Sequence, residues 1–146
     1  MLRVVLDTNI IVSSLISKSG PPAQIIDAWR QLKFILITSP AILEEIRAIL
    51  NHPRICKKYK IADEDIDALI DLLNQFALIV PGEANVAGAV PADPADEKFL
   101  ACALDGHANL LVSGDHHLLD LKFYQYFPLI TARQFLEQYM FSEGRV

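Results

Sequence analysis

Cysteine and long apolar runs are both scarce in this 146-residue sequence. The two cysteines, Cys56 and Cys102, lie in predicted helices without Cys-x-x-Cys spacing, so we expect reduced, packed side chains. The apolar runs fall far short of the ~20 residues that span a bilayer, which predicts no membrane association. Asp7 and Asn9 interrupt the N-terminus before any apolar segment of signal-peptide length forms, and we expect a cytoplasmic protein.

Positive charge is also scarce, because 13 Lys and Arg residues stand against 18 Asp and Glu residues and the formal net charge is -5. This balance argues against a general nucleic-acid coat protein, since nonspecific phosphate binding is built from Lys and Arg. A metal-dependent nuclease remains open. Carboxylates are the ligands of hard divalent cations, and the bound ions reverse the local sign of the electrostatic field.

Hydrophobic residues, by contrast, are abundant, at 52% of the chain with a mean hydropathy of +0.28. A chain of this length is large enough for a hydrophobic core of its own, and we predict a single domain over residues 1–146. The high apolar content also predicts some apolar surface, which would serve a homodimer or a partner protein.

Short apolar runs alternate with segments of helical periodicity along the chain. The predicted strands are residues 3–6, 34–37, 77–80, 109–112 and 127–130. The predicted helices between and after them are residues 10–17, 22–32, 40–50, 63–76, 93–104 and 131–139. This alternation predicts an α/β fold, a three-layer α/β/α domain with a central parallel five-stranded sheet and right-handed crossovers.

The first predicted strand ends abruptly on a carboxylate, Asp7, followed by Thr8 and Asn9. In open α/β sheets, ligands lie outside the carboxyl ends of the strands, so Asp7 would face the functional edge of the sheet. An equally simple interpretation is that Asp7 only caps the helix that follows, because Asp, Thr and Asn are common at helix N-termini. This residue alone does not decide between the two.

Three further acidic residues are placed in a similar way: Glu45 lies early on the helix after the second strand, Asp96 opens a helix, and Asp115 follows the fourth strand. Like charges gathered at one sheet edge need a cation to neutralise them. An oxygen-only ligand set favours Mg²⁺ or Mn²⁺ over Zn²⁺. With two such ions, water can be activated and a leaving oxygen stabilised, which is the chemistry of phosphodiester hydrolysis.

Four motifs in order resemble those of the PIN-domain ribonucleases, especially the toxins of toxin–antitoxin systems. They are Leu6-Asp7-Thr8-Asn9, Ser39-Pro40 through Glu45-Ile46, Asp93 through Ala103, and Val112-Ser113-Gly114-Asp115. The segment from Thr131 to Leu136 also resembles that group. Each motif is weak by itself, but the four together at these spacings are specific, and the resemblance runs nearly from end to end of the chain.

The resemblance implies a PIN-like fold, a metal-dependent endoribonuclease acting on single-stranded RNA, and a small antitoxin as a partner. It implies that four carboxylates are both catalytic and metal-binding, namely Asp7, Glu45, Asp96 and Asp115. Thr8, Asn9 and Ser113 would be supporting polar groups that hold a carboxylate or a metal-bound water in place.

Two of the ligand assignments stay open. Glu44 neighbours Glu45, and only the family pattern favours Glu45. Asp93 competes with Asp96: Asp93 precedes Pro94 and is typical of an N-cap, whereas Asp96 lies one turn inside the helix. Asp93 could still contact a metal through water, which makes it a supporting residue.

Two other clusters invite functional interpretations. His116 and His117 follow the fourth carboxylate, but adjacent histidines on a short turn favour a solvent-facing position, and we assign them no catalytic role. The one basic cluster is a candidate arm for contacting the RNA backbone, although a solvated helix face explains it as well. It consists of Arg54, Lys57, Lys58 and Lys60.

Two rival functions remain. Phosphatases of the haloacid-dehalogenase type also place an aspartate after the first strand, but they need a second aspartate two residues later, where this chain has Asn9. The rival from a different class is a non-catalytic PIN-like module that binds RNA or a protein. The residues themselves do not separate RNA from DNA, because metal-assisted hydrolysis needs no 2′-hydroxyl group.

Overall fold

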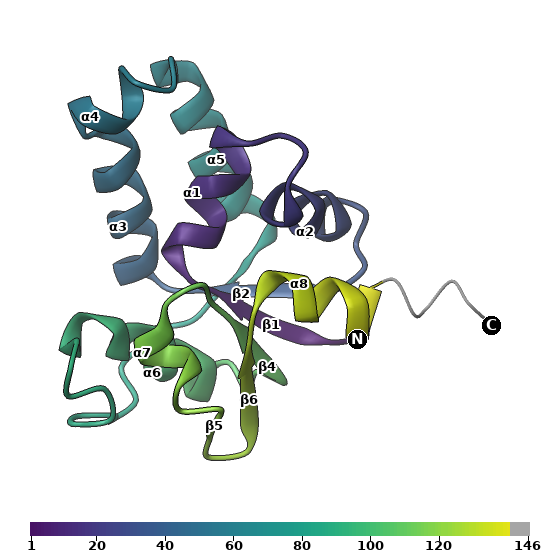
Figure 1. The fold of residues 1–146 in the computed structure, drawn as a ribbon, viewed down its shortest axis with the longest axis vertical. Helices are drawn as coiled ribbons and strands as arrows, with labels where there is room; N and C mark the ends of the chain where they lie inside the picture. Colours follow the sequence, from purple (N-terminus) through teal and green to yellow (C-terminus); the bar gives the residue numbers. More distant parts are fainter. Residues whose placement is uncertain (141–146) are drawn as a thin grey trace.

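The computed structural model describes residues 1–140, and its centre is a six-stranded sheet in the order β3-β2-β1-β4-β6-β5 (Figure 1). All neighbouring strands are parallel except β5 and β6, which pair antiparallel. The strands are β1 (Arg3–Leu6), β2 (Ile35–Thr38), β3 (Leu78–Ile79), β4 (Leu110–Val112), β5 (Phe123–Tyr124) and β6 (Phe127–Ile130). The predicted parallel α/β sheet is confirmed, with six strands rather than five.

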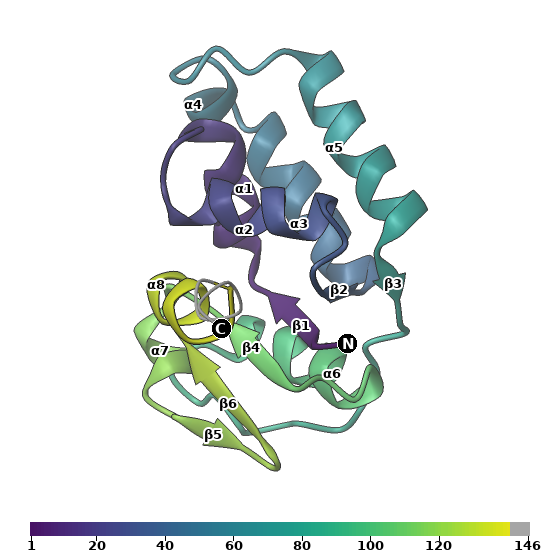
Figure 2. The same ribbon diagram turned by 90° about the vertical axis from the view of Figure 1, so that its right-hand side faces the viewer.

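Helices cover both faces of this sheet, as Figures 1 and 2 show. One face carries α1 (Thr8–Ile16), α2 (Pro21–Arg30), α3 (Pro40–Asn51) and α5 (Asp63–Phe76), and α8 (Ala132–Phe135) packs against α2. The opposite face carries α6 (Glu97–Asp105), which contacts β1, β2 and β4. The short helices α4 (Pro53–Cys56) and α7 (His116–Leu119), the 3₁₀ helix η1 (Pro94–Asp96) and the π-helix η2 (Leu136–Met140) complete the described elements.

Strand β1 lies in the middle of the sheet, and its valines are fully buried because both faces are covered. Val5 is in register with Ile37 of β2 and with Leu111 of β4. Just beyond β1, the backbone N–H of Asp7 donates to the carbonyl oxygen of Val112 at 3.0 Å. The carboxyl ends of β1 and β4 therefore lie side by side, and the residues that follow them are neighbours.

Side-chain caps explain where several helices begin. Ser39 Oγ accepts a hydrogen bond from the Ile42 N–H at 3.4 Å, and Pro40 occupies the first turn of α3, as the Ser-Pro pair predicts. Thr131 and Gln134 form a reciprocal capping box at the start of α8. The predicted helix that extends to residue 139 is only partly confirmed, because the α-helix changes to a π-helix at Leu136.

The sequence did not predict β5. It is only two residues long, and its connection to β6 is the pair Gln125-Tyr126, which lacks the glycine or asparagine typical of a tight hairpin turn. Gln125 nevertheless adopts a φ of 54°, the conformation that such a turn needs. The register then places Tyr124 opposite Phe127, which is fully buried.

The remaining expectations about composition can be compared with the described residues. Both cysteines are free thiols; Cys102 is buried, and burial raises its thiol pKa to about 12, which makes it unreactive. Within residues 1–140, no helix combines the length and apolar character that crossing a membrane requires.

Candidate metal centre

Asp7 occupies the junction between β1 and α1 and is only 2% exposed. Its Oδ1 accepts from the Ile10 N–H at 2.9 Å, so the capping interpretation is confirmed. Its Oδ2 accepts from the Ser113 hydroxyl at 2.5 Å and from the Gly114 N–H at 3.2 Å. Asp7 therefore caps α1 and, with its second oxygen, holds the loop after β4 at the carboxyl edge of the sheet.

That loop, Ser113-Gly114-Asp115, places the next carboxylate. Ser113 is fully buried, and its Oγ accepts from the Asp115 N–H at 2.9 Å while its hydroxyl donates to Asp7. Asp115 caps α7, because its Oδ1 accepts from the His117 N–H at 2.9 Å. Ser113 thus links Asp7 to Asp115 through two hydrogen bonds.

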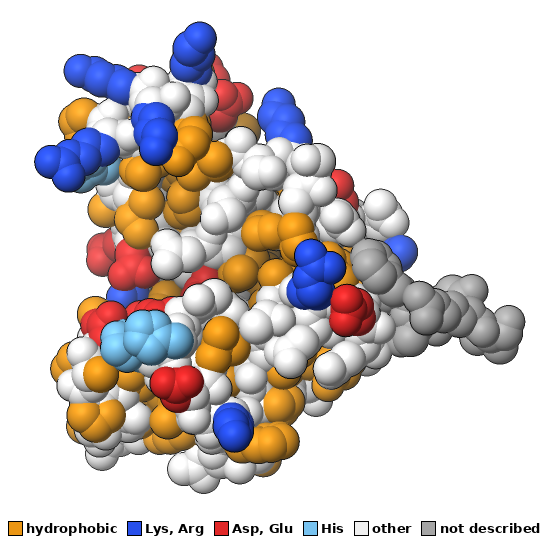
Figure 3. All heavy atoms as spheres, viewed as in Figure 1, with side chains coloured by type: hydrophobic (Ala, Val, Ile, Leu, Met, Phe, Trp, Pro, Cys, Tyr) orange, Lys and Arg blue, Asp and Glu red, His pale blue; other side chains and the backbone are white. Residues whose placement is uncertain are grey.

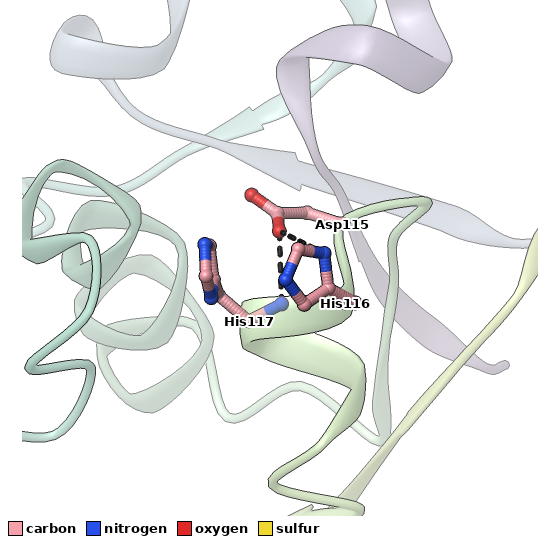
Figure 4. Close-up of side chains that lie close together, drawn as sticks. All are labelled: Asp115, His116 and His117. Atoms are coloured by element: carbon pink, nitrogen blue, oxygen red, sulfur yellow. Dashed lines mark hydrogen bonds and ion pairs between the residues drawn. The ribbon is translucent and has the colours of Figure 1, made fainter.

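Figure 4 shows how Asp115 lies relative to the histidine pair. One carboxylate oxygen contacts both the His117 backbone nitrogen and the His116 ring, whose Nδ1 is 4.0 Å away. The other oxygen is turned away from both rings. The His116 side chain is mostly exposed, in line with the solvent-facing position expected from the sequence.

The structure brings Asp93, Asp96 and Asp115 together, each offering a carboxylate oxygen within 4.8 Å of the others. Asp93 is the N-cap residue of η1 and Asp96 is its last residue, so a single 3₁₀ turn separates the two carboxylates. Both candidates for this position therefore join the cluster. Figure 3 shows acidic side chains gathered in a notch between the helices above the sheet and the α6–α7 region.

The pKa values of this cluster show the cost of bringing the charges together. The pKa of Asp96 is raised to about 7, first by burial, then by the contact with Asp115 and by the charges of Asp115 and Asp93. The pKa of Asp115 is lowered, chiefly because it accepts a hydrogen bond from Asp96. Burial is the main cause that raises the pKa of Asp7, and hydrogen bonds from Ser113, Ile10 and Gly114 oppose it.

The oxygen atoms of this cluster fit a hard divalent cation. The cluster offers oxygen atoms from three carboxylates, which is the ligand chemistry of Mg²⁺ and Mn²⁺. Among the described residues, the buried Oδ2 of Asp96 has no hydrogen-bond donor. A buried carboxylate oxygen without a partner is costly, and a bound cation would satisfy it.

Two threonine hydroxyls lie buried at the same edge of the sheet. Thr8, in the first turn of α1, and Thr38, at the end of β2, are both almost fully buried, and neither hydroxyl oxygen has a hydrogen-bond partner within residues 1–140. Thr38 was not singled out from the sequence, because a threonine at a strand end is ordinary. Asn9, the other supporting residue predicted beside Asp7, is exposed.

Glu45 points from α3 toward α6, where it meets a residue that sequence reasoning missed. Lys98 Nζ lies 2.6 Å from Glu45 Oε2 and also donates to the Ala95 carbonyl oxygen at 2.8 Å. The side chains of Lys98 and Glu45 are 19% and 33% exposed, whereas Glu44 faces solvent. Lys98 belongs to the third motif. A lysine in the acidic first turn of a helix is typical of a solvated charge, so the sequence did not indicate a functional role for it.

The basic cluster lies at the other end of α3. All four of its residues, Arg54, Lys57, Lys58 and Lys60, are exposed on α4 and the turn after it. Figure 3 shows basic side chains above the acidic notch, on the same side of the molecule. Helix α3 begins just after the carboxyl end of β2 and ends just before the basic cluster, and its 12 residues span about 18 Å at 1.5 Å per residue.

Comparison with known proteins identifies the fold and the family. The sequence model of the PIN domain matches residues 3–117. An uncharacterised protein of Methanocaldococcus jannaschii is 31% identical over 121 residues, which cover 83% of this chain and 76% of that protein. The crystal structure of VapBC2 from Rickettsia felis bound to a promoter DNA fragment contains a chain that matches this one with a TM-score of 0.59 at 15% identity. The match covers 89% of this chain and 98% of the matched chain, so the two chains share a fold. The chain belongs to the PIN-domain family.

Proposed function

We propose that this protein is a metal-dependent endoribonuclease that hydrolyses phosphodiester bonds of single-stranded RNA, with Mg²⁺ or Mn²⁺ held by the acidic cluster. PIN domains are generally metal-dependent nucleases, so the family supports the hydrolase class. The observation that carries the proposal is the meeting of Asp93, Asp96 and Asp115, with the buried Oδ2 of Asp96 lacking a hydrogen-bond partner among the described residues.

A divalent ion bound there would supply an activated water and would stabilise the leaving oxygen. The chain's own residues prepare that position. Asp96 and Asp115 present the oxygens, and Asp93 adds a third carboxylate from the start of η1. Asp7 accepts a hydrogen bond from Ser113, and Ser113 accepts one from the Asp115 N–H, so the two residues fix the position of Asp115. This is the usual role of residues that hydrogen-bond to a metal ligand.

RNA as the substrate follows from the resemblance of the four motifs. The basic cluster on α4 supports a nucleic-acid substrate, because it lies on the same side as the acidic notch and all of its side chains are exposed. A strand bound along α3 would contact these cations with its phosphates while one phosphodiester lies at the carboxylates.

A role as the toxin of a toxin–antitoxin module is part of the proposal. The matched Rickettsia felis structure is of VapBC2, and this chain shares the fold of one chain in that structure. An apolar surface is present for a partner or for a second copy in a homodimer: Leu32 is 71% exposed and Phe76 is 60% exposed. They border a hollow of about 330 Å³ that is also lined by Trp29 and Leu72.

The test combines metal binding with cleavage. Calorimetry with Mn²⁺ should show binding to the wild type and a loss of at least tenfold in affinity for Asp96→Asn and Asp7→Asn. A pool of mixed single-stranded RNA should be cut by the wild type in Mn²⁺ and not in EDTA. Asp71→Asn, at an exposed position on α5, is the matched control and should behave like the wild type.

Other outcomes separate the rivals. Metal binding without cleavage, together with RNA retention that survives Asp7→Asn, would favour the non-catalytic binding module. Equal cleavage in EDTA would refute metal-dependent hydrolysis. Hydrolysis of a small phosphomonoester with no cleavage of RNA would favour the phosphatase alternative.

A further inference from the structure

Lys98, two residues after Asp96 of the acidic cluster, places its ammonium group 2.6 Å from Glu45 Oε2. We propose that Lys98 acts as a resident cation. Its ammonium group pairs with the Glu45 carboxylate, so that Glu45 is not available as a metal ligand and the centre binds one divalent ion rather than two. This inference rests on the proposed metal-dependent function and assigns the lysine a positioning role that the sequence did not suggest.

Three contacts hold the ammonium in place. Lys98 Nζ lies 2.6 Å from Glu45 Oε2 on α3 and donates to the Ala95 carbonyl oxygen on η1 at 2.8 Å. It also lies 5.3 Å from the centroid of the Phe99 ring, which is buried. Two of its three N–H donors are therefore used by protein acceptors, and the aromatic face stabilises the same charge.

The Lys98–Glu45 pair is shielded from water more than an ordinary surface pair. The Arg47–Asp67 pair, which also starts on α3, has a separation of 3.5 Å and side chains that are 49% and 66% exposed. The corresponding values for Lys98 and Glu45 are 2.6 Å, 19% and 33%. A shorter, less hydrated ion pair is harder for a competing cation to displace, because solvent screens it less.

The distribution of carboxylate oxygens leads to the same conclusion. Asp93, Asp96 and Asp115 supply ligands within 4.8 Å of one another, which is enough for one ion completed by water. Asp115 also lies beside His116 and His117, but imidazole nitrogens suit Zn²⁺ or Cu²⁺ better than a hard cation such as Mg²⁺. A second ion bound by further carboxylates would have to draw on Asp7 and Glu45. Asp7 already uses both oxygens for hydrogen bonds within the protein, and Glu45 is paired with Lys98.

The experiment counts Mn²⁺ ions per chain by calorimetry and by the electron paramagnetic resonance spectrum of bound Mn²⁺. We expect one ion in the wild type, with the spectrum of an isolated Mn²⁺. Lys98→Met keeps the unbranched apolar stem as far as Cε and removes the ammonium group, so Glu45 becomes available and a second ion should bind. Two ions about 4 Å apart would give the broadened spectrum of a coupled pair.

Further variants connect the second ion to Glu45. The double variant Lys98→Met with Glu45→Gln should return to one ion, and Lys98→Arg, which keeps a cation, should also bind one. Arg47→Met is the matched control, since it removes a cation from an exposed pair on α3, and it should leave the count at one.

The outcomes distinguish this inference from the proposed function. Two ions in the wild type would overturn the inference and leave the metal-dependent function intact, and this measurement needs no variant to fold. One ion in Lys98→Met that melts like the wild type would also overturn it. No ion in the wild type would overturn the inference and the proposed function together.

Discussion

Ser113 is the residue on which the geometry of the acidic cluster depends most directly. Its hydroxyl donates to Asp7 and accepts from the Asp115 N–H, and it is fully buried. A buried group that satisfies two partners is expensive to remove, because each partner then loses a hydrogen bond that water cannot replace. The orientation of Asp115 therefore depends on a side chain that cannot itself reach solvent.

Ser113→Ala should lower the free energy of unfolding by about 1–3 kcal/mol, the cost of leaving buried polar groups unsatisfied. It should also weaken Mn²⁺ binding by about tenfold or more, because Asp115 loses its positioning contact. Thermal melting in EDTA measures the first effect and calorimetry the second. Ser14→Ala removes a hydroxyl that donates within α1 and should change stability little and Mn²⁺ affinity not at all. Wild-type Mn²⁺ affinity in Ser113→Ala would show that Asp115 needs no such support.

Asp96 makes the stability of the metal-free protein depend on pH. Its pKa is raised to about 7 in the folded chain, first by burial and then by Asp115 and Asp93, compared with about 4 in an unfolded chain. At pH values between these two pKa values, the folded chain holds the Asp96 proton and the unfolded chain has lost it. Protonation of Asp96 therefore favours folding. This stabilisation is lost as the pH rises through 7, where folding must accommodate an ionised Asp96.

Asp96→Asn removes that ionisation and should raise the melting temperature in EDTA by about 2–4 °C at pH 8, as expected for about 1 kcal/mol in a chain of this size. The gain should be smaller at pH 5, where Asp96 is already protonated in the folded chain. Melting curves at the two pH values test this, with Asp71→Asn as the exposed control. A gain that does not change with pH would mean that Asp96 does not titrate in this range.

Individual site residues differed in how well the sequence could place them. Asp7 and Asp115 follow strands β1 and β4, and adjacent parallel strands bring such residues together whatever the side-chain details. Asp93 and Asp96 could not be separated by spacing, and the 3₁₀ turn between them explains why both join the cluster. Lys98 was missed because its role depends on Glu45, a partner 53 positions away in the chain.

At the scale of elements, α6 packs very closely on the sheet at its C-terminal end. A Cβ atom on Gly106 would lie 2.6 Å from Ile37 Cγ2 of β2 and 3.2 Å from the Cys102 carbonyl oxygen. The Gly106 carbonyl oxygen also accepts two hydrogen bonds from the Arg3 side chain, at 2.9 and 2.6 Å. Glycine is needed here for close approach, and this approach fixes how α6 lies relative to β1 and β2.

Gly106→Ala should therefore destabilise the protein by about 1–3 kcal/mol, the usual cost of overpacking a core. The β-branched Ile37 cannot move its Cγ2 away without shifting β2. Chemical denaturation measures the effect. Gly114→Ala adds the same methyl group where no atom lies within 4 Å and should be nearly neutral. Equal stability of Gly106→Ala and the wild type would show that α6 can slide on the sheet.

The elements that the sequence predicted best are those with strong local signals. The apolar runs of β1, β2, β4 and β6 and the stripe of α5 are found within a few residues of their predicted bounds. The hairpin strand β5 and the π-helix η2 were not predicted, because pairing with β6 and packing against α2 determine them rather than local periodicity. β3 is shorter than predicted and lies at the sheet edge, with both residues partly exposed.

On the scale of the whole molecule, the net charge of -5 conceals a separation of charge. The acidic notch lies at the carboxyl edge of the sheet, and the basic cluster lies at the far end of α3 on the same side (Figure 3). An overall negative protein would repel nucleic acid at long range, so binding must come from local contacts between phosphates and these cations, helped by the bound metal. Such contacts make binding depend on salt.

Lys57→Glu combined with Lys58→Glu should weaken binding of single-stranded RNA and leave Mn²⁺ affinity unchanged, because the two sites lie at opposite ends of α3. Each phosphate contact contributes about 0.7 to the slope of log affinity against log salt for single strands, so loss of two contacts should reduce that slope by about 1.4. The slope can be measured by fluorescence anisotropy in an Asp96→Asn background, in which the RNA stays intact. Lys33→Glu combined with Lys122→Glu makes the same change in net charge at exposed lysines outside the basic cluster and should preserve the slope. If both pairs of substitutions weaken binding equally and without a change in slope, the cluster on α4 is only a solvated helix face, and the RNA must reach the acidic notch by another path.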